Sequence, residues 1–233
     1  MIDVVCVKWG TEYSDNYVHI LKAMIERNTT IPHRFLCFSD TEIDGIETRA
    51  LPEIDLKGWW NKLYLFSSGN KLSERIVYFD LDTVITGNID FFLKSNGNFC
   101  GIENLGVHNK YEWGEHYKNI FQSGVMAWKK SWANFIWDIF KDQQFEIVNE
   151  VRGDGEFLHI LFNKINKKPD LFQHLWPNKL KSYKYQVYDE GLDNTAIICF
   201  HGEPRPHQAI NETTHPWGTK FEPRPWLANY WKK

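Results

Sequence analysis

Short apolar runs alternate with a helical pattern in the first third of the chain, and this alternation most constrains the fold. Val4–Lys8 is the first run, and Arg34–Phe38 and Ile76–Phe79 follow it. After Ser14, a plausible N-cap, apolar residues repeat at helical spacing until Asn28. Continuous apolar strands alternating with helices are typical of an open, mainly parallel sheet that helices flank on both faces. We therefore expect an α/β fold.

The rest of the chain extends this pattern less regularly. With 233 residues, the chain is long enough to form one large core. We expect a main domain over residues 1–207 and a Pro- and Trp-rich C-terminal wrap or tail over residues 208–233, with irregular structure from Gly202 onward. The further strands and helices are expected near Glu47–Leu51, Trp59–Ser68, Phe121–Trp128, Ser131–Phe140, Asp154–Asn163 and Ala196–Phe200.

Composition excludes several classes of protein. The formal net charge of -3 argues against a nucleic-acid-binding surface, which is normally basic. No apolar stretch reaches the roughly 20 residues that a membrane span needs, and the first residues lack a signal-peptide layout, so we expect a cytoplasmic protein. The four cysteines are far apart and lie in or beside apolar segments, which favours buried, reduced thiols: Cys6, Cys37, Cys100 and Cys199.

An Asp-Leu-Asp triplet, Asp80-Leu81-Asp82, closes the apolar run Ile76–Phe79. Residues two apart on an extended chain point to the same side. At a separation of about 4 Å the two carboxylates would repel by about 4 kcal/mol at an effective dielectric of 20. A hard divalent cation would turn this repulsion into affinity. Because a triplet of this kind is expected about once by chance, its context must support the interpretation.

The context includes a histidine at a second strand end. His201 follows the apolar run Ala196–Phe200. A lone histidine there is usually only hydrogen-bonded, but with Asp80 and Asp82 it completes a set of ligands suited to Mn²⁺ or Mg²⁺. Arg205, between two prolines, could add a fork-shaped donor for a phosphate group.

Three other segments could contact a ligand. Lys62 lies in the first turn of an expected helix, where it could attract an anion, although a solvated lysine beside packed tryptophans is an equal alternative. Gln122, Ser123 and Gly124 interrupt an apolar strand, and glycine within a strand often marks the close approach of a ligand or of another backbone segment. Asp154 begins a later helix, where ordinary capping is the simpler explanation.

The order of these motifs resembles nucleotide-sugar glycosyltransferases of the GT-A fold. The resemblance is closest to glycosyltransferase family 8, which has glycogenin-like and bacterial galactosyltransferase-like members. It rests on Asp80-Leu81-Asp82, Phe121–Val125, Gly153–Glu156 and Phe200–Gly202, and it covers residues 1 to about 207. It implies a mixed, mainly parallel sheet in a single domain, and a hexosyltransferase that takes its sugar from a nucleotide-diphosphate sugar, most plausibly a UDP-sugar.

The resemblance also implies residue roles. Asp80, Asp82 and His201 would hold Mn²⁺, which bridges the donor phosphates, and Arg205 would contact the diphosphate. Gln122 stands where the family usually has Asn, and Gly155 follows Asp154 where the family commonly has Gln. Gln122 and Asp154 are nevertheless the candidates for residues that contact the donor sugar or act at the reaction centre. The remaining donor-binding candidates are Val7, Thr11, Tyr13 and Asp40 near the nucleoside, with Lys62, Asp80 and Ser123.

Two other functions remain open from the sequence. The segment Phe79–Ile85 also resembles the haloacid-dehalogenase phosphatase motif, in which the first aspartate attacks phosphorus. A catalytically silent module that binds a nucleotide sugar is a third possibility. The acceptor, whether a glycan, a protein or a small molecule, is not identified by any motif; the tail and the segment Asn104–His116 are the candidate regions for its site.

Overall fold

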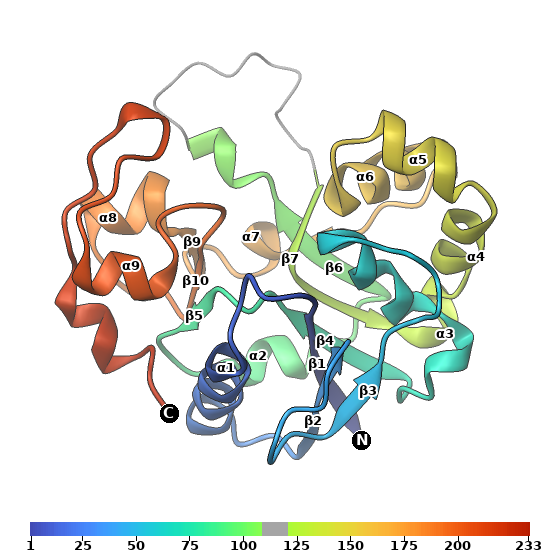
Figure 1. The fold of residues 1–233 in the computed structure, drawn as a ribbon, viewed down its shortest axis with the longest axis horizontal. Helices are drawn as coiled ribbons and strands as arrows, with labels where there is room; N and C mark the ends of the chain where they lie inside the picture. The colour runs from blue at the N-terminus through green and yellow to red at the C-terminus, as the bar shows by residue number, and fades with distance from the viewer. Residues whose placement is uncertain (109–120) are drawn as a thin grey trace.

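A seven-stranded sheet forms the centre of the computed structural model, which describes residues 1–108 and 121–233 (Figure 1). The strand order is β3-β2-β1-β4-β7-β6-β8. A smaller sheet of three strands lies beside it, in the order β5-β10-β9. The strands are β1 (Ile2–Lys8), β2 (His33–Ser39), β3 (Thr48–Ala50), β4 (Arg75–Phe79), β5 (Thr83–Ile85), β6 (Phe99–Glu103), β7 (Phe121–Lys129), β8 (Asp170–Leu171), β9 (Leu180–Ser182) and β10 (Ile197–Cys199).

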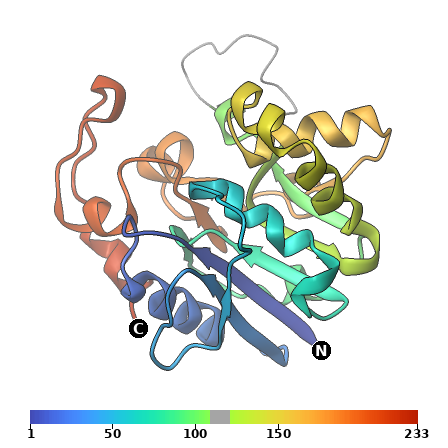
Figure 2. The same cartoon turned by 45° about the vertical axis from the view of Figure 1, so that its right-hand side comes forward.

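Helices lie on both faces of the large sheet, as Figures 1 and 2 show. The α-helices are α1 (Asp15–Asn28), α2 (Asp90–Leu93), α3 (Lys130–Ala133), α4 (Phe135–Asp142), α5 (Gln144–Glu150), α6 (Asp154–Lys164), α7 (Phe172–Leu175), α8 (Tyr188–Glu190) and α9 (Pro206–Asn211). The 3-10 helices are η1 (Gly58–Phe66), η2 (Ser68–Asn70), η3 (Leu105–His108), η6 (Pro216–Gly218) and η7 (Pro225–Asn229), and η5 (Tyr183–Val187) is a π-helix.

Strand direction determines which loops share an edge of the sheet. β3, β2, β1 and β4 are parallel, so their carboxyl ends meet at one edge. β7 runs antiparallel to β4, with Phe79 opposite Val125, and therefore begins at that same edge. Ligands of open α/β sheets bind beyond this edge. The expected single-domain α/β fold with a mixed, mainly parallel sheet is confirmed.

The sheet is buried on both faces, which explains why its strands are continuously apolar. Along β1, Val4 and Cys6 belong to one core with α1 and the small sheet. Val5 belongs to a second core with η1, α4 and α6. This alternation is the two-residue period of a strand. The four cysteines are all buried and free, as expected.

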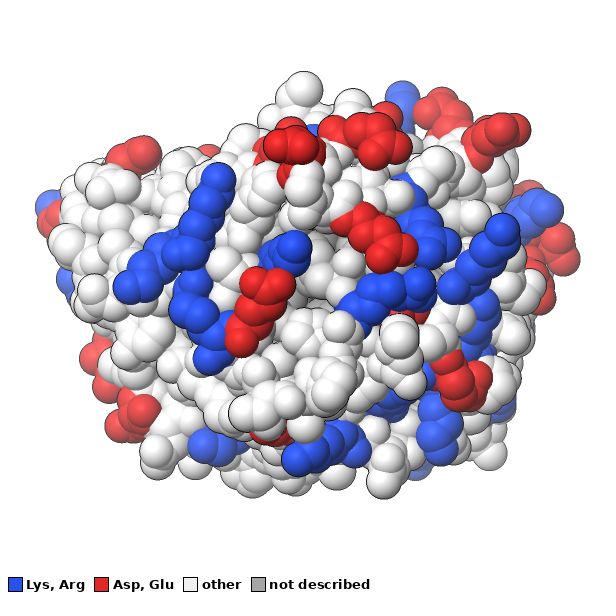
Figure 3. Space-filling view, turned by 90° about the horizontal axis from the view of Figure 1, so that it is seen from below, with Lys and Arg blue, Asp and Glu red and all other residues white. Residues whose placement is uncertain are grey.

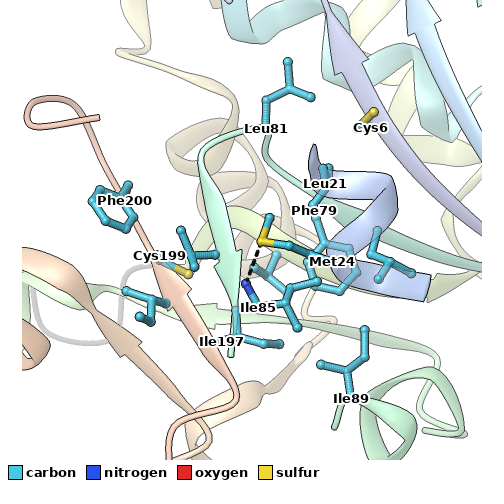
Figure 4. Close-up of a cluster of buried hydrophobic side chains, with 14 of the residues drawn as sticks. Cys6, Leu21, Met24, Phe79, Leu81, Ile85, Ile89, Ile197, Cys199 and Phe200 are labelled. Atoms are coloured by element: carbon cyan, nitrogen blue, oxygen red, sulfur yellow. Dashed lines mark hydrogen bonds between the residues drawn. The ribbon is translucent and has the colours of Figure 1, made fainter. Parts of the chain in front are cut away.

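Leu81 anchors the loop after β4 in the first core. Its side chain is buried beside Phe79 and the α1 residues Leu21 and Met24 (Figure 4). The amide of Ile85 donates to the Met24 sulfur at 3.4 Å, which ties β5 to α1 in the same cluster. The Asp-Leu-Asp triplet is therefore fixed to the core through its middle residue.

The C-terminal segment packs against α1. The Arg27 side chain donates to the backbone carbonyls of Tyr230 and Lys232, at 3.0 and 2.8 Å, and Leu227 is fully buried. The expectation of irregular structure from Gly202 onward was wrong at α9, whose first residue is Pro206. Proline suits the first position of a helix because its fixed φ is helical, and because the backbone N–H that it lacks would have no partner within the helix. The proposed boundary at residue 207 falls inside this helix and stays a prediction.

Two of the predicted helices differ from the structure, one in its type and one in its extent. The helix expected at Trp59–Ser68 is the 3-10 helix η1, and the helix after Ser131 is divided into α3 and α4. Apolar residues three or four apart suit both types of helix, so their spacing does not distinguish them. β6 was not predicted.

Charge is mixed on the face of the molecule that Figure 3 shows, which is the view from below Figure 1. Basic and acidic side chains are interspersed there, whereas a nucleic-acid-binding face would be basic over a continuous area. Within residues 1–108 and 121–233, no helix combines the length and the apolar character needed to cross a membrane.

Replacing Asp3 by asparagine should destabilise the sheet in a pH-dependent way. Asp3 is fully buried and accepts hydrogen bonds from Arg34 Nε and Nη2, at 2.9 and 2.8 Å, and from the Ser73 amide at 2.6 Å. Burial raises the pKa of Asp3, but these hydrogen bonds outweigh it and lower the pKa below its usual value. The resulting stability is present above the unfolded-state pKa of about 3.9 and is lost as the pH falls through the lower folded-state pKa.

We expect Asp3→Asn to lower the free energy of unfolding by about 2 kcal/mol at neutral pH. The deficit should shrink in acid, where the wild-type carboxylate is protonated. Urea unfolding at neutral and acidic pH measures both values, and Asp44→Asn, at an exposed position, is the matched control. A deficit that is the same at both pH values would contradict the ion-pair explanation.

Candidate active site

A cavity of about 720 Å³ opens at the carboxyl edge of the large sheet. Its wall combines the ends of β1 and β4, the start of β7, the first turns of η1 and α6, and the loop after β10. Most of the predicted site residues line it: Val7, Tyr13, Lys62, Asp80, Asp82, Gln122, Ser123, Asp154, His201 and Arg205.

Thr11 and Asp40 are two predicted nucleoside contacts that the structure does not bring to the cavity wall. Both are exposed. The Asp40 carboxylate instead accepts a hydrogen bond from the Gly10 amide at 2.8 Å, and so joins the loops after β1 and β2. In the structure, Asp40 therefore holds the loops after β1 and β2 together.

Lys62 lies between two carboxylates in the cavity wall. Its Nζ is 3.1 Å from Asp80 Oδ1 and 3.0 Å from Asp154 Oδ2, and it donates to Ser123 Oγ at 3.2 Å. Ser123 Oγ in turn donates to Asp154 at 2.5 Å, and the Tyr78 hydroxyl donates to Asp80 at 2.5 Å. Burial lowers the pKa of Lys62, but the two carboxylates outweigh it and raise the pKa above its usual value. Lys62 is thus a buried ammonium, and the alternative of a solvated side chain is wrong.

Packing of η1 explains why a lysine is buried there. Trp60 stacks on Phe140 of α4, with the ring centroids 5.7 Å apart, and Leu63 is fully buried. The Asn61 side chain donates to the carbonyls of Leu56 and Gly58 at 3.1 and 3.2 Å. The helix is therefore held rigidly against the second core, with Lys62 directed into the cavity wall.

Asp82 is paired with a different basic side chain, Arg205. It accepts hydrogen bonds from the Tyr13 hydroxyl at 3.0 Å and from Arg205 Nη1 at 2.7 Å. The Arg205 guanidinium also lies over the Tyr13 ring, 4.8 Å from its centroid, and pairs with Glu12. Burial and the charge of Asp80 raise the pKa of Asp82 to about 6, although Arg205 opposes the rise. Each carboxylate of the triplet thus faces one basic side chain.

His201 lies across the cavity on the loop after β10. Its Nε2 is 2.8 Å from Ser182 Oγ, and its carbonyl accepts a hydrogen bond from Lys184 Nζ at 2.5 Å. Burial and the Lys184 charge lower the pKa of His201 to about 3. At neutral pH the imidazole is therefore uncharged, which is the form that binds metal ions.

The predicted metal ligands fit a divalent cation by their chemistry but are not preassembled. Asp80 and Asp82 supply hard oxygen donors, and the raised pKa of each shows that this part of the wall favours added positive charge. In the part of the chain that the structure describes, however, no three His, Cys, Asp or Glu residues are gathered into a metal-binding group. Lys62, Arg205 and Ser182 instead contact Asp80, Asp82 and His201 respectively.

Two amide side chains form a pair at the start of β7. Gln122 Nε2 donates to Asn104 Oδ1 at 3.0 Å, and Gln122 Oε1 accepts from the Leu105 amide at 3.3 Å. Asn104 also lines the cavity. The sequence placed Asn104 in the candidate acceptor segment, but its pairing with Gln122 was not predicted, because β6, which ends beside it, was not predicted. Residues 109–116 of the candidate acceptor segment lie outside the described residues.

Glycines let the elements of the site approach closely. A Cβ added at Gly124 would lie 3.1 Å from Asp80 Oδ2, and one at Gly155 would lie 3.4 Å from the Gln122 Cα. The Gly124 carbonyl accepts the Asp80 amide at 2.8 Å, which fixes the start of the triplet. Glycine in β7 thus marks a close approach, as its sequence context predicted.

Comparison with solved structures shows which class of protein has this fold. The galactosyltransferase LgtC, in complex with donor and acceptor sugar analogs, superposes with a TM-score of 0.59 and 10% identity over 88% of each chain. The glycosyltransferase GlyE of Streptococcus pneumoniae TIGR4 superposes with a TM-score of 0.62 and 14% identity over 88% of this chain. The match covers 55% of GlyE, so this chain spans about half of that protein's length.

The chain therefore has a GT-A-like glycosyltransferase fold, as the sequence motifs predicted. At these identities the likeness defines the fold, and function must be argued from the site. No protein-family model matches the chain, and no curated protein matches its sequence.

Proposed function

We propose that this chain is a metal-dependent glycosyltransferase that moves a hexose from a nucleotide-diphosphate sugar to a carbohydrate acceptor. The observation that carries the proposal is the pairing of each triplet carboxylate with a buried or half-buried cation on one cavity wall: Asp80 with Lys62, and Asp82 with Arg205. A wall that alternates these charges suits an anionic ligand that binds together with a cation. The fold shared with two glycosyltransferases gives independent support.

The diphosphate is the part of the donor that these residues would recognise. Bond cleavage at the anomeric carbon leaves its electron pair on the diphosphate, which gains negative charge as the sugar becomes oxocarbenium-like. Arg205, whose guanidinium is planar and half-buried, can bind phosphate oxygens in a bidentate manner. A divalent ion held by Asp80, Asp82 and His201 would supply Lewis-acid stabilisation of the same charge, worth several kcal/mol.

Other parts of the wall suit the nucleoside and the sugar. Val7 and Tyr13, at the end of β1 and in the loop after it, offer an apolar and an aromatic surface for a base, which we propose to be uracil. Gln122 and Asp154 offer hydrogen-bonding groups for sugar hydroxyls near the anomeric carbon, with Ser123 between Lys62 and Asp154. The acceptor hydroxyl would form the new bond to the anomeric carbon and pass its proton to the departing diphosphate oxygen. Attack from the face that the diphosphate leaves would retain the configuration, which is the outcome that the resemblance to family 8 implies.

The phosphatase alternative has less support from the structure. The solved structures of LgtC and GlyE, which share this fold, are glycosyltransferases. A silent binding module would have the same cavity and is distinguished only by the absence of turnover.

A thermal-shift panel tests the proposal. Nucleoside diphosphates, nucleotide sugars and phosphomonoesters are each added with Mn²⁺, with Mg²⁺ and with a chelator. We expect one nucleoside diphosphate and its sugar to stabilise the protein only when a divalent ion is present, by about 2.7 kcal/mol at a ligand concentration of 100 times Kd. Stabilisation by phosphomonoesters alone, or by nucleotides regardless of metal, would contradict the proposal.

A further inference from the structure

Trp217 is an exposed tryptophan at the tip of a C-terminal hairpin, which we call the Trp217 arm (residues 214–221). The backbones of Thr214 and Phe221 exchange hydrogen bonds of 3.0 and 2.9 Å at its base. The Phe221 ring is buried against Tyr188, with the centroids 4.8 Å apart. The arm rises from the body near α8 in Figures 1 and 2. Its base is thus anchored, while the Trp217 side chain is 74% exposed.

The conformation of Trp217 is unfavourable for a residue of its type. Its φ of 52° and ψ of 28° lie in the left-handed region, which a bulky residue rarely adopts. The next residue, Gly218, has a φ of 79° and is of the type that suits such a turn. Because the Trp217 ring gains little burial, neither local conformation nor packing accounts for tryptophan here. Strain of this kind without a folding benefit points to a role in binding.

Lys184 connects the ring to the cavity. Its Nζ lies 3.9 Å from the centroid of the Trp217 ring and donates to the carbonyls of His201 and Glu203, at 2.5 and 2.9 Å. Two carbonyl acceptors hold the Lys184 amino group without help from the indole, so covering Lys184 is not a sufficient reason for Trp217. The contact does fix the orientation of the ring. His201 and Gly202 line the cavity, so Lys184 links the Trp217 ring to the backbone of the cavity wall.

The size and surroundings of the Trp217 ring indicate the kind of ligand. Its exposed neighbours on the arm are polar: His215, Thr219 and Lys220 are half-buried or exposed. A stable protein partner needs roughly 800 Å² of interface on each side, far more than one indole provides. A pyranose ring has an apolar C–H face about as large as an aromatic ring, with hydroxyls around its edge, and it therefore suits a flat aromatic face with a polar surround.

We propose that Trp217 is a carbohydrate-stacking subsite for the acceptor, and that the acceptor is an oligosaccharide. The subsite would bind a sugar unit outside the cavity, one or more units away from the unit that receives the hexose. This inference rests on the proposed function and narrows its carbohydrate acceptor to an oligosaccharide.

The test uses three variants of the full chain. Trp217→Gly removes the ring and suits the left-handed backbone, so its melting temperature should not fall. Trp217→Phe keeps a flat aromatic face. Phe145→Ala is the matched control, because Phe145 is 77% exposed on α5 and does not line the cavity. The probe is a printed array of defined mono-, di- and tetrasaccharides, incubated with Mn²⁺ and a labelled form of the nucleotide sugar that stabilises the protein.

We expect the wild type to label at least one oligosaccharide. For that acceptor, Trp217→Gly should raise KM about 10-fold with little change in kcat, as the loss of one stacking contact predicts. Trp217→Phe should stay close to the wild type, and Phe145→Ala should match it. Unchanged acceptor KM in Trp217→Gly, equal losses with monosaccharides, or a wild type that labels no oligosaccharide would each overturn the inference.

Donor hydrolysis in the absence of any acceptor separates this inference from the proposed function. If metal-dependent hydrolysis of the nucleotide sugar persists in the wild type and in Trp217→Gly while the array result is negative, only the acceptor subsite is wrong. If the wild type neither binds nor hydrolyses any nucleotide sugar, the proposed function is wrong and the subsite inference is wrong with it.

Discussion

Replacing Lys62 by methionine is expected to lower the free energy of unfolding by about 3–5 kcal/mol, the usual cost of leaving a buried charge without its partner. Lys62 is only 5% exposed and is the shared partner of Asp80 and Asp154. Methionine preserves the length and the apolar stem of the side chain. The loss would therefore arise from two uncompensated carboxylates and not from a cavity in the core.

Two further measurements identify the cause. The double variant Lys62→Met with Asp154→Asn should recover a large part of the lost stability in urea unfolding, because one of the two unpaired charges is gone. The Lys62→Met deficit should also diminish as the pH falls, because Asp80, whose pKa is raised by burial, can then become protonated. Catalysis should not recover in the double variant. A Lys62→Met protein as stable as the wild type would show that the two ion pairs contribute nothing net.

Replacing Asp82 by asparagine is expected to weaken metal-dependent binding of the nucleoside diphosphate by on the order of 100-fold, with the fold intact. Asparagine keeps the size of the side chain and still accepts hydrogen bonds from Tyr13 and Arg205. Burial and the charge of Asp80 raise the pKa of Asp82 to about 6, so the ionised carboxylate does not stabilise the folded protein at neutral pH. The negative charge of Asp82 is thus expected to contribute to ligand binding and not to the stability of the fold.

Calorimetric titration with the nucleoside diphosphate, with and without Mn²⁺, measures this effect. Asp44→Asn is the matched control, because Asp44 is an exposed aspartate that does not line the cavity. His201→Ala should reduce the metal-dependent part of the affinity in the same way. An Asp82→Asn variant with wild-type affinity in the presence of Mn²⁺ would remove Asp82 from the proposed metal site.

The strands and their ends could be predicted from the sequence because their signal is local. Val4–Lys8 and Ile76–Phe79 are buried on both faces, so their apolar runs are continuous, and the polar residues after them mark the edge where the cavity lies. The Asp-Leu-Asp triplet was found for the same reason. β6 gave no clear signal of this kind, so the pairing of Asn104, which follows β6, with Gln122 was not predicted.

The partners of the site residues could not be predicted, because they depend on pairings between distant segments. Lys62 meets Asp154 only because η1 and α6 pack on the same face of the sheet. Ser182 lies next to His201 because β9 pairs with β10, where Cys199 is opposite Ser182. Neither pairing leaves a pattern in the local sequence. The residue types of a candidate metal site were therefore evident from the sequence, whereas the present partners of its three ligands were not.

The central claim, that the cavity is a donor site for a nucleotide-diphosphate sugar, is tested most directly by the release of nucleoside diphosphate from a panel of nucleotide sugars. The account predicts that the wild type releases the diphosphate from one donor in the presence of Mn²⁺, and that a chelator or Asp82→Asn stops the release. Release of inorganic phosphate from phosphomonoesters, with a phosphoryl group trapped on Asp80 and no cleavage of any nucleotide sugar, would contradict it.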